Sequence, residues 1–155
     1  MRHINIDQIS DQIWTIPGRN MKATNDKLSD FRVPLSNQAN NVIQLALPFA
    51  TEGYLFPGIR KGVISDATMS RMMERRGMKE RPHGFRSSLR TWLADCTDAP
   101  EEVAETVLAH SPGSKVVRAY RRTDFLEQRA VLMQRWADHI TGRSNLKIID
   151  KAYKV

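Results

Sequence analysis

Two histidines, an arginine and a tyrosine stand in a fixed order across the second half of the chain. They are His83, Arg86, His110 and Tyr120, and a polar segment upstream, residues 18–30, carries several cations. Breaking a phosphodiester through a covalent enzyme intermediate needs a hydroxyl nucleophile, cations beside the non-bridging oxygens, and an acid for the leaving oxygen. A tyrosine, an arginine, two histidines and a loop lysine can meet those needs without a metal. Taken singly, each of these side chains is more often structural or solvated, so only their combination makes phosphodiester chemistry a hypothesis.

The charge balance favours a nucleic-acid partner. The 155 residues include 24 Lys and Arg against 17 Asp and Glu, which is a net charge of +7. This excess in one domain is the electrostatic footprint of a nucleic-acid binder, although ribosomal, membrane-surface and other basic proteins share it. With 41% hydrophobic and 26% charged residues, the composition is globular, which argues against a disordered or fibrous chain.

The sequence contains no signal for a membrane span or a disulfide framework. Its apolar stretches, such as residues 45–50 with Pro48 inside, are far shorter than the roughly 20 residues that cross a bilayer. No apolar signal-peptide run follows Met1, so we expect a cytoplasmic protein with no membrane partner. The single cysteine, Cys96, lacks the neighbours of a metal or redox motif, and we expect it to be a small buried hydrophobe.

Local patterns in the first half predict a hairpin followed by helices. Residues 12–17 and 31–35 are β-forming runs joined by the polar loop. Ser36 is a suitable N-cap for a core-facing helix that ends near Pro48. The expected apolar positions of that helix are Ala39, Val42, Ile43, Ala46 and Leu47. A short strand at residues 53–58 and a helix from Ser65 to a stop at Gly77 should follow.

Local patterns in the second half predict further helices. In residues 83–96, helical geometry groups Phe85, Leu89, Trp92, Leu93 and Cys96 on one arc and His83, Arg86 and Arg90 on another. The next helix begins near Pro100 and ends near His110, and a short one from Ser114 should include Tyr120. Asp124 and Glu127 resemble a capping box for a last long helix that stops at Gly142. Its expected apolar positions are Leu126, Ala130, Met133, Ala137 and Ile140. His3 and His139 have no motif context and are expected to be structural or surface residues.

The order and spacing of these residues resemble the tyrosine recombinases, the phage integrase family, and most of all the integrases of prophages and genomic islands. The matching stretches are Trp14-Thr15-Ile16-Pro17, Met21-Lys22, Val33-Pro34-Leu35-Ser36, Leu55-Phe56-Pro57, His83-Gly84-Phe85-Arg86, Leu108-Ala109-His110, Tyr120 and Leu132-Met133-Gln134-Arg135-Trp136-Ala137-Asp138. Each piece alone is weak, but together they cover most of the chain and make the match strong. The resemblance implies an α+β, mostly α fold, in which the helices accompany a small antiparallel β-sheet.

The resemblance also implies a role for each residue in site-specific DNA recombination. Tyr120 would attack the scissile phosphate to form a 3′-phosphotyrosine, and Arg86 would bind that phosphate. His83 would be a base or phosphate ligand, His110 would hydrogen-bond the phosphate, and Lys22 would protonate the leaving 5′ oxygen. Further cations that we expect to contact DNA phosphates are Arg19, Lys27, Arg90, Arg118, Arg121 and Arg122. The implied partners are double-stranded DNA attachment sites and, in the intact protein, a homo-tetramer on DNA, with no cofactor and no metal.

One part of the family pattern is missing from this sequence. Members carry another active-site arginine, in a Thr-Gly-x-Arg-like stretch before the first strand, and core-binding and arm-binding domains upstream. We therefore expect residues 1–155 to be part of a catalytic domain with a flexible tail at 143–155, weakly active or inactive in isolation. The alternative is a catalytically inactive DNA-binding remnant of a prophage integrase. A tyrosine-type topoisomerase and a basic helical protein with a chance motif remain as weaker alternatives.

Overall fold

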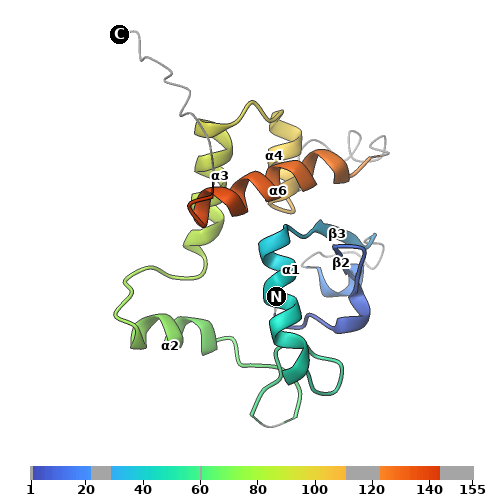
Figure 1. Cartoon of the computed structure of the whole chain (residues 1–155), viewed down its shortest axis with the longest axis vertical. Helices are drawn as coiled ribbons and strands as arrows, with labels where there is room; N and C mark the ends of the chain where they lie inside the picture. The colour runs from blue at the N-terminus through green and yellow to red at the C-terminus, as the bar shows by residue number, and fades with distance from the viewer. Residues whose placement is uncertain (1, 22–28, 60, 111–122, 144–155) are drawn as a thin grey trace.

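The computed structural model describes residues 2–21, 29–59, 61–110 and 123–143. Over these ranges the chain forms five α-helices and a small antiparallel sheet, which confirms the predicted mostly α class (Figure 1). No helix in the described ranges is long and apolar enough to cross a membrane. The expected helix around Tyr120 and, apart from Arg143, the expected tail at 143–155 lie outside the described residues.

The sheet has three strands in the order β1-β2-β3, all antiparallel. They are β1 (Ile9–Ser10), β2 (Ile13–Ile16) and β3 (Phe31–Pro34), and the β2–β3 pair is the predicted hairpin. The sequence patterns did not predict β1, because two residues make no alternating run. Asp11 and Gln12 join β1 to β2 with φ of 49° and 59°, as in a type I′ turn, without the Asn-Gly or Asp-Gly pair that usually signals one.

Helix α1 (Asn37–Ala46) begins where predicted. The Ser36 hydroxyl accepts a hydrogen bond of 3.2 Å from the Ala39 amide, which confirms the N-cap. The buried face is narrower than predicted: Ile43 is buried, but Val42 is 56% exposed. The reason is that Ile43 packs with Ile4 and Leu55 on one side of α1 only. A 3-10 turn, Leu47–Phe49, follows α1 at Pro48.

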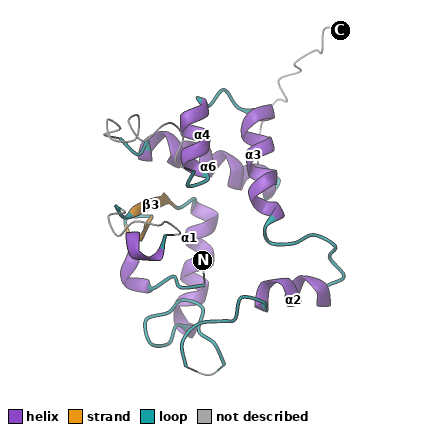
Figure 2. Ribbon diagram, turned by 180° about the vertical axis from the view of Figure 1, so that it is seen from behind, coloured by secondary structure: helices purple, strands orange, loops and turns teal. Residues whose placement is uncertain are grey.

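The region after α1 has less regular structure than predicted. Residues 53–58 form isolated bridges, such as Thr51 with Tyr54 and Pro57 with Val63, instead of a strand. Helix α2 (Thr68–Arg75) starts three residues after Ser65, whose hydroxyl pairs with that of Thr68 at 2.9 Å, and ends before Gly77 at φ +71°. In Figures 1 and 2, α2 lies to one side of the other helices.

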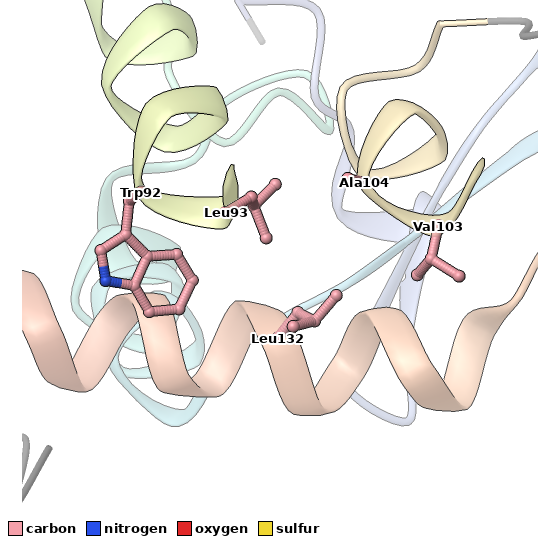
Figure 3. Close-up of a cluster of buried hydrophobic side chains, with 5 residues drawn as sticks. All are labelled: Trp92, Leu93, Val103, Ala104 and Leu132. Carbon is pink, nitrogen blue, oxygen red and sulfur yellow. The ribbon is translucent and has the colours of Figure 1, made fainter. Parts of the chain in front are cut away.

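Helices α3 (Gly84–Cys96), α4 (Glu101–Val107) and α6 (Leu126–Ile140) surround the larger core cluster. Figure 3 shows its buried members, Trp92, Leu93, Val103, Ala104 and Leu132. The cluster uses the later turns of α3 but not its ends, since Phe85 and Cys96 are exposed. The expectation that Cys96 is buried is therefore wrong, because Cys96 is the last residue of α3 and lies outside this cluster.

Helix α6 lies between the α3–α4 pair and the α1–sheet layer, as both views of the chain show (Figure 2). Its buried residues are Arg129, Leu132 and Ala137, whereas Ala130 and Ile140 of the predicted apolar set are exposed. The predicted capping box is also wrong. Phe125, at φ +55°, holds the N-cap position and no side chain caps the helix there, because the Asp124 carboxylate binds Arg32. Gly142, at φ +69°, follows the helix as predicted.

Candidate functional site

The end of α4 places His110 through a tight backbone turn. The Ala109 amide donates to the Thr106 carbonyl at 2.9 Å, and the His110 amide donates to the Glu105 carbonyl at 2.9 Å. These two bonds form a Schellman motif, with Ala109 in the left-handed conformation at φ +54°. The turn therefore sets the position of the His110 backbone just beyond the carbonyl end of the helix.

Arg86 of α3 contacts the same turn. Its Nη2 donates to the Leu108 carbonyl oxygen at 2.6 Å, across 22 positions of sequence. Leu108 is the C-cap residue of α4, at the helix end where carbonyls have no partner within the helix. The bond uses one of the five N–H donors of the guanidinium and fixes where the rest of the group lies. Arg86 and His110 are thus brought together at the end of α4.

Glu105 joins His110 to a further arginine that the sequence placed on the same face as Arg86. Its Oε2 lies 2.5 Å from His110 Nδ1, and its Oε1 accepts from Arg90 Nε at 2.9 Å. Arg90 Nη2 also donates to Glu101 Oε1 at 2.6 Å. The hydrogen bond from His110, helped by Arg90, holds the pKa of Glu105 below its ordinary value despite partial burial. Hydrogen bonds to Glu105 and Glu101 raise the pKa of Arg90.

Sequence reasoning missed Glu105. A glutamate on a helix surface is usually solvated, and the only local signal was its place five residues before His110. Arg90, which was predicted to contact DNA, makes two ion pairs inside the chain. That prediction stays a prediction, because either pair can coexist with a phosphate nearby.

His83 occupies the N-cap position of α3 and is exposed, without a side-chain cap bond. Its carbonyl accepts the Arg86 amide at 3.2 Å, one turn along. Residues three apart on a helix lie on the same face, so His83 and Arg86 share one side of α3. Within the described part of the chain, no side-chain hydrogen bond joins His83 to Arg86 or His110.

Of the remaining predicted residues, Arg19 lies in the described ranges and the others do not. Arg19 lies exposed in a 3-10 turn, Gly18–Asn20, which Pro17 separates from β2. The Gly18 amide donates to Asp30 Oδ1 at 3.0 Å, which ties the two ends of the polar loop together. The predicted residues outside the described ranges are Lys22, Lys27, Arg118, Tyr120, Arg121 and Arg122. The described residues include no group of three or more His, Cys, Asp or Glu side chains placed to hold a metal ion.

A second polar cluster, also missed from sequence, fastens the start of α6 to β3. Arg129 is 1% exposed, and its Nη2 and Nη1 donate to the carbonyls of Arg32 at 2.7 Å and Asp124 at 3.2 Å. Its guanidinium lies 4.6 Å from the ring centroid of Phe31. Burial lowers the pKa of Arg129. Arg32 and Asp124 themselves form a two-bond ion pair at 2.8 and 2.9 Å. This cluster holds the start of α6 against β3 of the hairpin.

The chain is similar to three named integrases. It is 33% identical over 141 residues to the prophage integrase IntA of Escherichia coli K12, a match that covers 88% of this chain and 33% of that protein. It is 28% identical over 149 residues to the integrase of Enterobacteria phage P4, covering 86% of this chain and 34% of that protein. It is 32% identical over 139 residues to the E. coli K12 prophage integrase IntZ, covering 85% and 33%.

The chain thus spans about a third of the length of these curated relatives. Neither a family model nor a solved structure matches it. Each match covers at least 85% of this sequence, so each includes helices α3 and α4 with Arg86 and His110. Over most of its length, this chain is a relative of the phage and prophage integrases.

Proposed function

We propose that this chain carries part of the active site of a tyrosine recombinase, which breaks and rejoins DNA during integration. The observation that supports it most is the pairing of Arg86 with the turn that carries His110, through the 2.6 Å bond to the Leu108 carbonyl. An arginine and a histidine beside each other suit a phosphate group, because both can donate hydrogen bonds to its oxygens. The similarity to three integrases supports the same substrate class.

In the proposed reaction, the phenolic oxygen of Tyr120 attacks the phosphorus of a DNA phosphodiester. A new phosphorus–oxygen bond forms to the tyrosine, the bond to the 5′ oxygen breaks, and the phenolic proton passes to His83. Lys22 gives a proton to the departing 5′ oxygen. Arg86 and His110 stabilise the negative charge that gathers on the non-bridging oxygens. A 5′ hydroxyl from another strand reverses the step and rejoins the strands.

The proposed partner is double-stranded DNA, which four protomers would bind together in the intact recombinase. The net charge of +7 supports DNA contact. The candidate arginines Arg19 and Arg118 and the lysine Lys27 would contact phosphates outside the reacting one. By itself, the chain should bind DNA weakly, on the order of 10⁻⁴–10⁻⁶ M, and release it as salt increases.

The second candidate function is DNA binding without cleavage. The observation that favours it, for residues 1–155 taken alone, is that no Thr-Gly-x-Arg-like stretch precedes the first strand among them. Loss of one donor to a developing oxyanion costs about 10²–10³ in rate, which would leave little turnover in the isolated chain.

A nicked DNA duplex that traps the covalent intermediate tests the proposal. The assay compares the chain, its Tyr120→Phe variant and the matched control Tyr54→Phe, each alone and fused behind the part of IntA that lies outside the matched stretch. A covalent adduct that forms with the chain and with Tyr54→Phe but not with Tyr120→Phe supports the recombinase. Salt-sensitive DNA binding without any adduct, even in the fusion, refutes it and favours the second candidate.

A further inference from the structure

We propose that Glu105 is a positioning residue that holds the His110 imidazole by Nδ1 and leaves Nε2 as the nitrogen that meets the phosphate. The inference rests on the proposed function, which gives His110 a phosphate to bind. In this proposal, Glu105 touches no substrate, but it determines which nitrogen of His110 faces the phosphate.

Glu105 holds His110 at two places. Its backbone carbonyl accepts the His110 amide at 2.9 Å, and its side chain meets Nδ1 at 2.5 Å. The first contact fixes the backbone and the second fixes the ring, so the side chain has little rotational freedom left. The Glu105 side chain is 21% exposed and that of His110 is 48% exposed, so the pair lies at the surface with its ring accessible.

The donor and acceptor roles of this pair follow from the chemistry of the carboxylate. The lowered pKa of Glu105 means that the group is ionised at neutral pH, and an ionised carboxylate can only accept hydrogen bonds. The hydrogen between the two side chains therefore belongs to Nδ1 of His110. Nε2 is then a lone-pair acceptor when the ring is neutral and a donor when the ring is an imidazolium. Since a phosphate oxygen only accepts, the productive form is the imidazolium, with Glu105 as its counter-charge.

Arg90 keeps the carboxylate in the orientation that this arrangement needs. Arg90 Nε donates to Oε1 of Glu105, so the carboxylate turns its other oxygen, Oε2, toward His110. A second bond, from Arg90 to Glu101, holds the guanidinium itself in place. The charged groups that these bonds join to His110 or to its turn are Glu101 and Glu105 on α4 and Arg86 and Arg90 on α3. When His110 is an imidazolium, the row from Glu101 through Arg90 and Glu105 to His110 alternates in charge.

The substitution Glu105→Gln tests the inference with almost no change of shape. A glutamine has one acceptor oxygen and one donor NH₂ group, and the Arg90 guanidinium can only donate. The amide oxygen will therefore face Arg90 and the NH₂ group will face Nδ1, which must then accept. The hydrogen of the neutral His110 ring will move from Nδ1 to Nε2. The matched control is Glu127→Gln, which removes the same charge from an exposed position on α6.

Nitrogen-15 NMR of the ring nitrogens reads the tautomer directly, at about pH 9, where an ordinary imidazole is neutral. The His110 signals are identified among the four histidines by their loss in His110→Asn. We expect the hydrogen on Nδ1 in the wild-type chain and in Glu127→Gln, and on Nε2 in Glu105→Gln. A hydrogen on Nε2 in the wild-type chain, or no change in Glu105→Gln, would overturn the inference. This measurement needs no activity, so it stands even if the proposed function fails.

The kinetic consequence is measured in the form that yields the Tyr120-dependent adduct. A charged donor bonds a phosphate about twice as strongly as a neutral one, so Glu105→Gln should slow adduct formation at saturating DNA by about tenfold. DNA affinity should stay within about twofold, because the Arg86 and loop contacts remain. An unchanged adduct rate in Glu105→Gln overturns the inference while leaving the proposed function intact. Absence of any wild-type adduct refutes the proposed function instead.

Discussion

Ala109 has a backbone conformation that suits glycine. It sits at φ +54° in the turn that ends α4 and positions His110. An L-residue with a Cβ in this region is strained by roughly 1–2 kcal/mol, because the Cβ approaches the following carbonyl oxygen. The substitution Ala109→Gly removes the strain but increases the conformational entropy of the unfolded chain. That second effect lowers the free energy of unfolding by about 0.4–1 kcal/mol. The difference predicts that Ala109→Gly raises the free energy of unfolding by about 0.5–1 kcal/mol.

Thermal unfolding followed by far-UV circular dichroism measures this prediction. For a chain of this size, 1 kcal/mol moves Tm by about 2–4 °C, so Ala109→Gly should raise Tm by about 1–4 °C. The matched control is Ala130→Gly on the exposed face of α6, in regular helical backbone. There the same change should lower stability by about 1 kcal/mol, since glycine costs that much in a helix interior.

The two substitutions are chemically identical, so opposite signs can come only from the backbone at each position. Equal lowering of Tm by both would refute the reasoning, because it would mean that Ala109 is not in the left-handed conformation. The turn bonds at Thr106 and His110 do not involve the Ala109 side chain. Tyr120-dependent adduct formation, where present, should therefore be unchanged in Ala109→Gly.

The other predictions concern the two polar clusters. Arg129→Leu should lower the free energy of unfolding by about 2–4 kcal/mol in urea, because it leaves the carbonyls of Arg32 and Asp124 without their donor; a loss below 0.5 kcal/mol, typical of surface sites, would contradict it. A double-mutant cycle of Arg32→Ala and Asp124→Ala should give a coupling of about 1 kcal/mol or less that shrinks with salt, since both side chains are partly exposed. A coupling that ignores salt would contradict a solvent-screened pair. Folding lowers the pKa of Glu105, so its ionised form stabilises the folded chain at any pH above the pKa that Glu105 has when unfolded. This stabilisation is lost as the pH falls below that value toward the lower pKa of the folded state. Below roughly pH 4.3, wild-type stability should therefore fall more steeply than that of Glu105→Gln, and parallel curves would argue against the pairing.

The sequence by itself determined the features that depend on neighbouring residues. The β-forming runs of β2 and β3, the Ser36 cap, the start of α4 after Pro100 and the end of α6 before Gly142 all carry local signals and were predicted. Such signals work because capping, turn formation and helix termination involve groups within a few positions of each other. The order of His83, Arg86, His110 and Tyr120, and with it the resemblance to integrases, also needs only the sequence.

Only the tertiary structure decided which side of each helix is covered. Cys96 is exposed because its helix ends outside the core cluster, and Arg129 is buried because β3 and the start of α6 surround it with carbonyls and a ring. A periodic pattern counts apolar residues, so it assigns an arginine to the surface and shifts the buried face of α6 toward Ala130.

The pairing of Glu105 with Arg90, and of Arg86 with the Leu108 carbonyl, was equally beyond the sequence. Each bond joins α3 to α4, 15 or 22 positions apart, and it exists because the two helices pack on one hydrophobic cluster. Polar partners at that separation have no local signature, since their meeting depends on how the core aligns the helices. The sequence therefore determines the residue types for the proposed chemistry, whereas the packing of α3 against α4 determines the contacts that orient His110 and Arg86.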